Sequence, residues 1–152
     1  MKGIRIIAII LVSVGVAFIL ACSEQKTASL EGNEDIVAVI QKLPECYNNP
    51  ITAMEIYSDD AVLMSKDYCT GQMVKFTGPK EIGDLKKEQG KGWGVPEITI
   101  RSIKKEADKA HVEYSLFRQG VEGKSFDITH EGSAEMLKKR QTWKIKQDRL
   151  EY

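Results

Sequence analysis

The sequence has no excess of charge of either sign. Its 152 residues include 22 Lys and Arg side chains against 22 Asp and Glu side chains. The first 21 residues carry only Lys2 and Arg5 as charged groups, so the remainder has 20 basic and 22 acidic groups. Such a balance provides no general attraction to nucleic acid or to an anionic surface. We therefore expect no nucleic-acid partner.

Motifs for metal binding and for redox chemistry are also missing. The chain has three cysteines and two histidines, no Cys-x-x-Cys pair, and no metal-ligand spacing between its histidines. We therefore expect no metal and no cofactor. The composition, 42% hydrophobic and 29% charged, is typical of an ordinary globular domain, and the length suits a single one.

No apolar run reaches the roughly 20 residues that a membrane-spanning helix needs. Residues 6–21 are almost wholly apolar, but these 16 residues would extend only about 24 Å as a helix. They follow a short basic start that contains Lys2 and Arg5, an arrangement typical of a secretory signal. The N-terminus therefore predicts that the protein is exported.

The apolar stretch ends in Ile19-Leu20-Ala21-Cys22, which resembles a bacterial lipobox. The resemblance implies cleavage before Cys22, acylation of this residue, and attachment to the cell envelope by several acyl chains, which anchor a protein stably. Ser23 after the cysteine, in place of Asp, favours the outer membrane. The alternative is an uncleaved anchor helix in which Cys22 is an ordinary residue. In either case the protein is tethered to a membrane.

Three regions follow from this interpretation: a signal peptide over residues 1–21, a polar and flexible tether over 22–33, and one domain over 34–152. Three helices are predicted early in the domain. Residues that cap or break helices mark their limits. The first helix is capped by Asn33 and interrupted at Pro44, the second starts at Pro50, and the third runs from Pro79 to Gly90.

Strands dominate the rest of the domain, with alternating apolar residues and turn signals between them. They are predicted over residues 61–64, 73–76, 97–106, 110–117, 124–140 and 142–147. Residues 58–60 are expected to form a turn, and Glu131-Gly132 a bulge. Helices gathered early and antiparallel strands late predict an α+β fold, with a curved, cone-like sheet packed against about three N-terminal helices.

The order of these elements resembles the nuclear transport factor 2-like superfamily, the cone-shaped, cystatin-like α+β fold shared with SnoaL-like polyketide cyclases and ketosteroid isomerase. The matching segments are Tyr47 near the end of the first helix and residues 57–63, 77–82 and 137–145. The resemblance implies an apolar pocket between the helices and the concave sheet. Relatives include enzymes, ligand carriers and partner-binding modules, so the fold does not fix the function.

The catalytic residues of the enzymes have no counterparts here. Ketosteroid isomerases need a general-base Asp with a Tyr/Asp pair, and SnoaL-like cyclases need an Asp/His pair. Neither set falls on matching positions of this sequence, so the resemblance implies no catalytic residue. It implies a likeness to bacterial members that include secreted lipoproteins.

Cys46 and Cys69 are the cysteines outside the lipobox. An exported compartment permits a disulfide between them, and closing this loop would contribute about 3 kcal/mol in the chain-entropy model. Free buried thiols are the alternative, and a redox or metal role is a third. The spacing alone does not choose among them.

Two kinds of side chain are candidates for lining a pocket. The first are the aromatic residues Tyr47, Tyr57, Phe76 and Trp93, for which plain core packing is the alternative. Trp93 lies between glycines on a loop, where it either gates a pocket mouth or is an exposed anchor.

The second kind are titratable groups on the late strands. His111 and Glu113 share one face of their strand and would form an acid/base pair if that face is concave. The alternative is a polar stripe that faces solvent. His130 lies near the expected bulge, with a similar alternative.

Three functions are compatible with these features. The first is a non-catalytic module that binds a small apolar ligand or a partner protein at the cell envelope. The second is a small lyase or isomerase that uses a His or an acid in the cone. The third is an envelope protein that forms a homodimer through its sheet. A cone filled by its own residues would favour interaction roles, and a deep pocket ending in an acid/base group would favour the enzyme.

Overall fold

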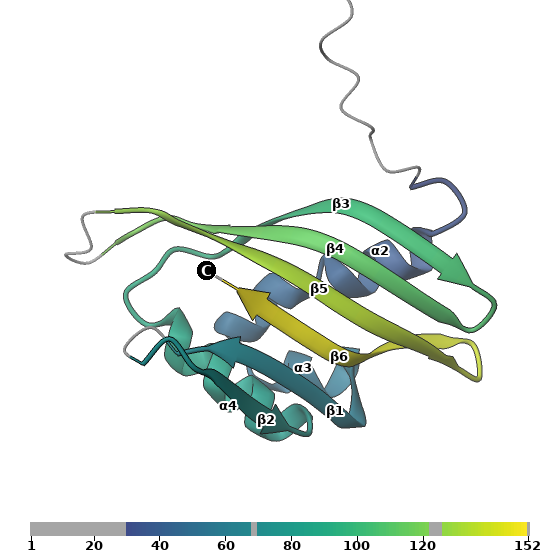
Figure 1. Ribbon diagram of the computed structural model, residues 1–152, viewed down its shortest axis with the longest axis horizontal. Coiled ribbons are helices and arrows are strands. Elements are labelled where there is room, and N and C mark those ends of the chain that lie inside the picture. Colours follow the sequence, from purple (N-terminus) through teal and green to yellow (C-terminus); the bar gives the residue numbers. More distant parts are fainter. Residues whose placement is uncertain (1–29, 68–69, 122–125, 152) are drawn as a thin grey trace, which may run out of the picture.

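The computed structural model describes residues 30–67, 70–121 and 126–151, which form one curved sheet with helices gathered on one of its faces (Figure 1). The helices are α2 (Glu34–Ile40), the 3-10 helix η1 (Leu43–Tyr47), α3 (Ile51–Ile56) and α4 (Pro79–Gly90). The strands are β1 (Tyr57–Lys66), β2 (Met73–Thr77), β3 (Glu97–Glu106), β4 (Lys109–Arg118), β5 (Ile128–Lys139) and β6 (Thr142–Glu151). The predicted α+β class is confirmed.

The sheet has the strand order β2-β1-β6-β5-β4-β3. All neighbouring strands are antiparallel except β1 and β6, which are parallel. Helices α2 and α3 pack against β6, and α4 packs against β1 and β2. The inner face of the sheet is therefore covered by helices, whereas the outer face is not.

The helices follow the proline and cap signals of the sequence. α2 ends at Ile40, and Pro44 lies in the first turn of η1, where its missing N–H is no loss. Helix α3 begins at Ile51, one residue after the predicted start at Pro50, and the side chain of Asn49 accepts the N–H of Ile51 at 3.2 Å. Asn33 is the N-cap residue of α2, as predicted, but its side chain makes no cap bond, and its backbone (φ −127°, ψ 18°) is not extended.

Helix α4 lies unusually close to the chain in front of it. A Cβ on Gly83 would stand 2.5 Å from the carbonyl oxygen of Pro50, so only glycine permits this contact. The close packing turns Ile82 and Lys86 toward the interior, where both are fully buried. The ammonium group of Lys86 belongs to the candidate site described below, where it pairs with Asp148.

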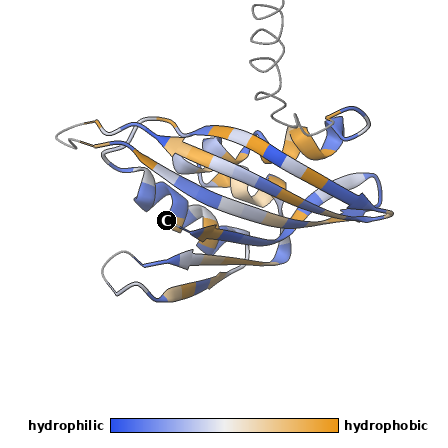
Figure 2. Cartoon of the chain, turned by 45° about the horizontal axis from the view of Figure 1, so that its top comes forward, coloured by the Kyte–Doolittle hydropathy of each residue, from blue (hydrophilic) through white to orange (hydrophobic). Residues whose placement is uncertain are grey.

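Alternation along the strands separates the two faces of the sheet. On β4 the inward residues Ala110, Val112, Tyr114 and Leu116 are buried, as predicted, and their neighbours are not. Figure 2 shows the same change of hydropathy along the strands. The inward side chains form one core with those of the helices and β6, among them the fully buried Trp143.

The structure corrects several sequence-based predictions. Residues 58–60 are not a turn but part of β1, which meets β6 with a register shift between Tyr57 and Val62. Strand β6 continues to Glu151 because β1 and β5 both supply backbone partners for it along its length.

The predicted bulge at Glu131-Gly132 is also wrong. Pairing between β4 and β5 is unbroken through this point, and Gly132 stands directly opposite Tyr114. The irregularity of β5 lies instead in its pairing with β6, between Glu135 and Met136. Gly132 instead leaves room for the ring of Tyr114, which a Cβ at this position would overlap.

Several predictions fall outside the described residues. These are the signal peptide, acylation of Cys22, most of the tether, and the state of Cys69. Within the described ranges, no helix is long and apolar enough to cross a membrane.

Candidate functional site

A buried carboxylate is held by two tyrosines inside the cone. Asp148 of β6 is fully buried, and the hydroxyl of Tyr114 donates to its Oδ1 at 2.5 Å. The hydroxyl of Tyr57 donates to its Oδ2. Burial, followed by the charge of Asp148, raises the pKa of both phenols well above the usual value of 10. Both tyrosines therefore remain hydrogen-bond donors.

Lys86 of α4 completes this group. Its Nζ lies 3.4 Å from Oδ2 of Asp148, and both side chains are 0% exposed. Burial alone would lower the pKa of Lys86, but the neighbouring acidic groups Tyr47 and Asp148 outweigh burial and raise it. Lys86 therefore stays protonated. We call Tyr57, Lys86, Tyr114 and Asp148 the inner cluster.

His130 of β5 also faces the interior and is 2% exposed. Burial, and then the positive charges of Arg118 and Lys86, lowers its pKa from 6.5 to about 3. The imidazole is therefore neutral near pH 7. It is a weak base, because protonation would add a third positive charge to a buried region.

Arg118, the last residue of β4, is 3% exposed and lies between two aromatic rings. Its guanidinium carbon is 4.8 Å from the ring centroid of Tyr47 and 5.2 Å from that of Trp93. Its terminal nitrogen donates to the backbone carbonyl of Gln89, which fixes the guanidinium plane. Stacking of this kind suits arginine because its charge is delocalised and weakly hydrated.

The stack continues to the surface at this end of the sheet. Trp93 packs edge-to-face against Phe126, with ring centroids 5.7 Å apart at 73°. Phe126 is 58% exposed, and the nearby Val95 is 63% exposed. We call Tyr47, Trp93, Arg118 and Phe126 the aromatic end. In this group the exposed ring of Phe126 packs on Trp93, which in turn packs on the buried Arg118.

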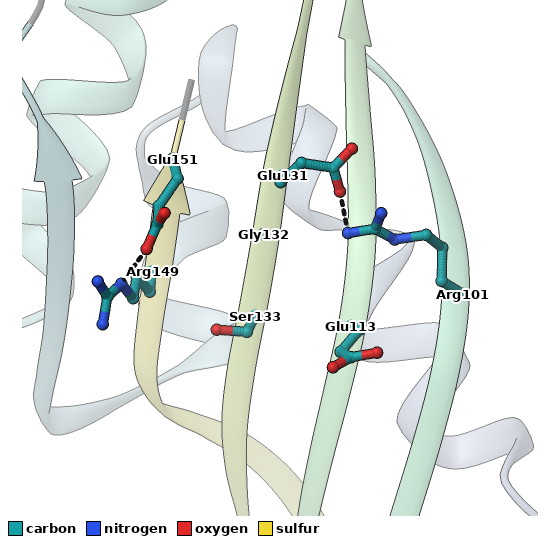
Figure 3. A pocket seen from close by; sticks show the side chains of 7 residues that line it. All are labelled: Arg101, Glu113, Glu131, Gly132, Ser133, Arg149 and Glu151. Atoms are coloured by element: carbon teal, nitrogen blue, oxygen red, sulfur yellow. Dashed lines mark ion pairs between the residues drawn. The ribbon is translucent and has the colours of Figure 1, made fainter.

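The outer face of the sheet carries a hollow of about 160 Å³ (Figure 3). Two ion pairs cross it, Arg101 with Glu131 and Arg149 with Glu151 at 2.6 Å. All four side chains are about half exposed, so water screens these pairs and each adds little stability. The hollow is lined by Arg101, Glu113, Glu131, Gly132, Ser133, Arg149 and Glu151.

His111 and Glu113 lie on this outer face and not in the cone. Nδ1 of His111 is 2.6 Å from Glu135 and its Nε2 is 3.8 Å from Glu113. Glu113 also accepts the hydroxyl of Ser102 at 2.9 Å. The solvent-facing polar stripe is therefore the alternative that the structure supports, since the inner residues of β4 point the other way.

The other candidates fall in different places. Tyr47 and Tyr57 lie inside the cone beside Lys86, and Phe76 of β2 packs against the core.

Cys46 is a fully buried free thiol, and burial raises its pKa to about 11. The free buried thiol is therefore the alternative that the structure supports for Cys46, and the predicted disulfide with Cys69 is not supported. Among the described residues, no three His, Cys, Asp or Glu side chains are placed to hold a metal ion.

Sequence reasoning missed Lys86, Arg118 and Asp148. Lys86 follows the buried Ile82 by four residues, and this helical spacing was a usable signal. Arg118 was likewise on the inward side of its alternating strand. Asp148 had no such signal, because the register shift in β6 turns it inward against the alternation.

Comparison with known proteins gives structural likeness only. No family model matches the chain, and no curated protein matches it. A nuclear transport factor 2-like protein of unknown function from Silicibacter pomeroyi has a TM-score of 0.64 and 11% identity, over 82% of this chain and 98% of its own. An uncharacterised protein with a cystatin-like fold from Caulobacter vibrioides has a TM-score of 0.61 and 17% identity, over 79% and 88%.

A third similar structure contains a bound molecule. It is a hypothetical protein with a ketosteroid isomerase-like fold from Catenulispora acidiphila, in complex with trimethylamine, with a TM-score of 0.55 and 14% identity over 75% of this chain and 84% of its own. At these identities the likeness concerns the fold alone. The chain therefore has the nuclear transport factor 2-like α+β fold that its sequence predicted.

Proposed function

We propose that this protein is an exported lipoprotein, tethered to the cell envelope through an acylated Cys22, whose cone domain binds a small apolar ligand without acid–base catalysis. The basic start, the apolar stretch and the lipobox-like residues support export and tethering. The aromatic end supports binding, because it joins exposed apolar side chains to a buried, positively charged interior.

The state of the inner cluster argues against the alternative, a small lyase or isomerase. General acid–base catalysis works best with a group whose pKa lies near the working pH. Lys86 and the two tyrosines have raised pKa values, and His130 has a pKa of about 3. These groups keep one charge state across neutral pH, which suits a fixed scaffold better than proton transfer.

The ligand's charge follows from the charges of the cone. The buried charged side chains of the described residues are Lys86, Arg118 and Asp148, which is two cations against one anion. The two cations also lie over the rings of Tyr47 and Trp93. A cationic ligand would compete with them for those rings. We therefore expect a neutral or anionic ligand, unlike the trimethylamine bound by the Catenulispora protein.

Three probes with the same apolar body test this expectation: phenylacetate, 2-phenylethanol and phenethylamine. Fluorescence of Trp93 reports binding at the aromatic end, since the second tryptophan, Trp143, is buried in the core. We expect phenylacetate to bind most tightly and phenethylamine least. Mass spectrometry of ligand that co-purifies with the mature chain would identify the natural compound.

Matched variants locate the signal. Trp143→Phe should keep the fluorescence response and Trp93→Phe should abolish it. Arg118→Met should remove the preference for phenylacetate over 2-phenylethanol, because only the acid is attracted by the guanidinium. Failure of all three probes to bind at millimolar concentration, or tighter binding of the amine, would contradict the proposed ligand class.

A further inference from the structure

Two hairpin turns come together at one end of the sheet. The turn between β3 and β4 and the turn between β5 and β6 are joined by a backbone hydrogen bond of 2.8 Å from Lys138 to Asp108. Figure 1 shows both turns at the end where β3 finishes and β6 begins. Cations are concentrated there: Lys104, Lys105, Lys109, Lys138, Lys139 and Arg140. The acids of the same two turns are Glu106 and Asp108.

The chain enters the domain at this same end. The carbonyl of Gly32 accepts Nζ of Lys105 at 3.2 Å, and Asp35 accepts the indole N–H of Trp143 at 2.7 Å. Figure 1 shows the first described residues and the start of α2 beside these turns. The ten residues from Cys22 to Glu31 would therefore leave the domain from its basic end.

The entering segment brings acids of its own, Glu31, Glu34 and Asp35. Glu34 accepts the N–H of Gly32 and Asp35 accepts the indole N–H of Trp143, but these neutral donors leave both carboxylates charged. The charge of Lys105 lowers the pKa of each, after the larger effect of their hydrogen bonds. The two turns carry six cations against two anions, and with the three acids of the entering segment the balance of this end is six against five.

Each of the two turns holds one non-glycine residue with a left-handed backbone, Ala107 with φ of 50° and Arg140. Arg140 has φ of 52°, in the left-handed region that glycine or asparagine adopts more easily. Lys105 and Lys138 lie over the ring of Trp143, 5.7 and 5.9 Å from its centroid. Two of the six cations of the basic end are therefore held against an aromatic ring.

We propose that this basic end rests on the anionic headgroups of the bilayer in which the lipid of Cys22 is anchored. The inference rests on the proposed tether, which brings the turns within reach of the surface. Lys and Arg side chains near an anionic leaflet are attracted to it over about one Debye length. The contact would orient the domain so that the aromatic end, at the far end of the sheet, points away from the membrane.

Amine footprinting of the mature, lipidated chain tests the contact. The protein is reconstituted into vesicles of phosphatidylcholine alone or with one third phosphatidylglycerol, labelled with an acetylating reagent, and analysed by peptide mass spectrometry. We expect labelling of Lys104, Lys109 and Lys139 to fall at least about threefold on the anionic vesicles, because electrostatic contact covers their amines. Lys66 and Lys75, on the β1–β2 hairpin, should be labelled equally on both.

Salt and charge reversal complete the test. In about 1 M NaCl, where the Debye length is about 3 Å, the protection should disappear. Inorganic phosphate added to neutral vesicles should give no protection, which separates a lipid surface from a phosphate site. Lys139→Glu with Arg140→Glu should abolish protection of Lys109, whereas the control pair Lys66→Glu with Lys75→Glu should not.

The outcomes separate the contact from the tether. If the protein floats with neutral and anionic vesicles but its amines are labelled equally on both, the contact is wrong and the tether stands. If Cys22→Ala changes neither acylation nor flotation, the lipid tether itself is wrong, and the orientation proposed from it is wrong as well.

Discussion

The ring of Tyr114 lies across Gly132 on the neighbouring strand. The two residues are directly paired between β4 and β5, and a Cβ on Gly132 would overlap the Cε2 and Cζ atoms of the ring. Absence of a side chain at this point lets Tyr114 pass over β5 and reach Asp148 on β6. Gly132 is thus a packing glycine of the inner cluster, and its strand is not bent there.

Replacing Gly132 with alanine should therefore destabilise the domain by about 2–4 kcal/mol. The estimate combines the cost of overpacking a buried site with weakening of a hydrogen bond to a charged group. Urea unfolding followed by circular dichroism measures it. Gly94→Ala is the matched control, because a Cβ there would be at least 3.5 Å from its nearest neighbour. Equal stability of the two variants would contradict the packing role of Gly132.

The buried ion pair should respond very differently from an exposed one. Asp148→Asn leaves Lys86 as a buried charge without its countercharge, and we expect a loss of about 3–5 kcal/mol. Asp84→Asn removes the partner of Lys80 in a pair that is 85% and 58% exposed, and should cost less than about 1 kcal/mol. Unfolding free energies of both variants provide the measurement.

A second change separates the charge from the packing. If the loss in Asp148→Asn comes from the uncompensated ammonium, adding Lys86→Met should recover part of the lost stability, since both partners are then neutral. A double variant that is less stable by the full sum of the two single losses would show that Lys86 and Asp148 do not act as a pair.

The sequence predicted the large features of this fold because they depend on local patterns. Proline and glycine marked the limits of α4, and alternation on β4 separated the inner from the outer face. Tyr47 and Tyr57 were pocket candidates as aromatic residues, and His130 was one as a titratable group on a late strand, with a solvent-facing position as its alternative. The alternation of β4 correctly placed His111 and Glu113 on the same face. It did not show whether that face was the concave one, because this depends on where the helices pack.

The centre of the inner cluster was beyond such patterns. Asp148 turns inward only because β6 shifts its register against both β5 and β1, and a shift of one residue exchanges the two faces of a strand. Pairing partners set that register, and they lie far away in the sequence. Tyr114 was placed on the inner face, but its bond to Asp148 depends on the glycine between them.

The outer face bears on the proposed homodimer. Side chains around its hollow, such as Arg101, Glu131 and Arg149, are charged and about half exposed, whereas stable homodimer interfaces are largely apolar. We therefore expect any dimer through the sheet to be weak, with dissociation in the micromolar range or above, and to weaken further in salt. Sedimentation at low and high ionic strength measures this. A salt-resistant nanomolar dimer would contradict the prediction.

His130 should make stability depend on pH in the acidic range. Its pKa is about 3 in the folded protein and near 6.5 when the chain is unfolded, so the unfolded state binds the proton more readily. The stabilisation from the neutral imidazole is fully present above pH 6.5. It is lost as pH falls from 6.5 toward 3, by at most about 1.4 kcal/mol per pH unit.

Unfolding free energies measured between pH 4 and pH 7 should therefore fall more steeply for the native sequence than for His130→Gln, which has no group to protonate at this site. The matched control is His111→Gln, which removes the half-exposed histidine of the outer face and should leave the difference intact. Asp35 and Asp60, whose pKa values are lowered by hydrogen bonds to Trp143 and Lys146, contribute equally in all three proteins. Parallel pH profiles for the native protein and His130→Gln would mean that His130 is not buried as a neutral base.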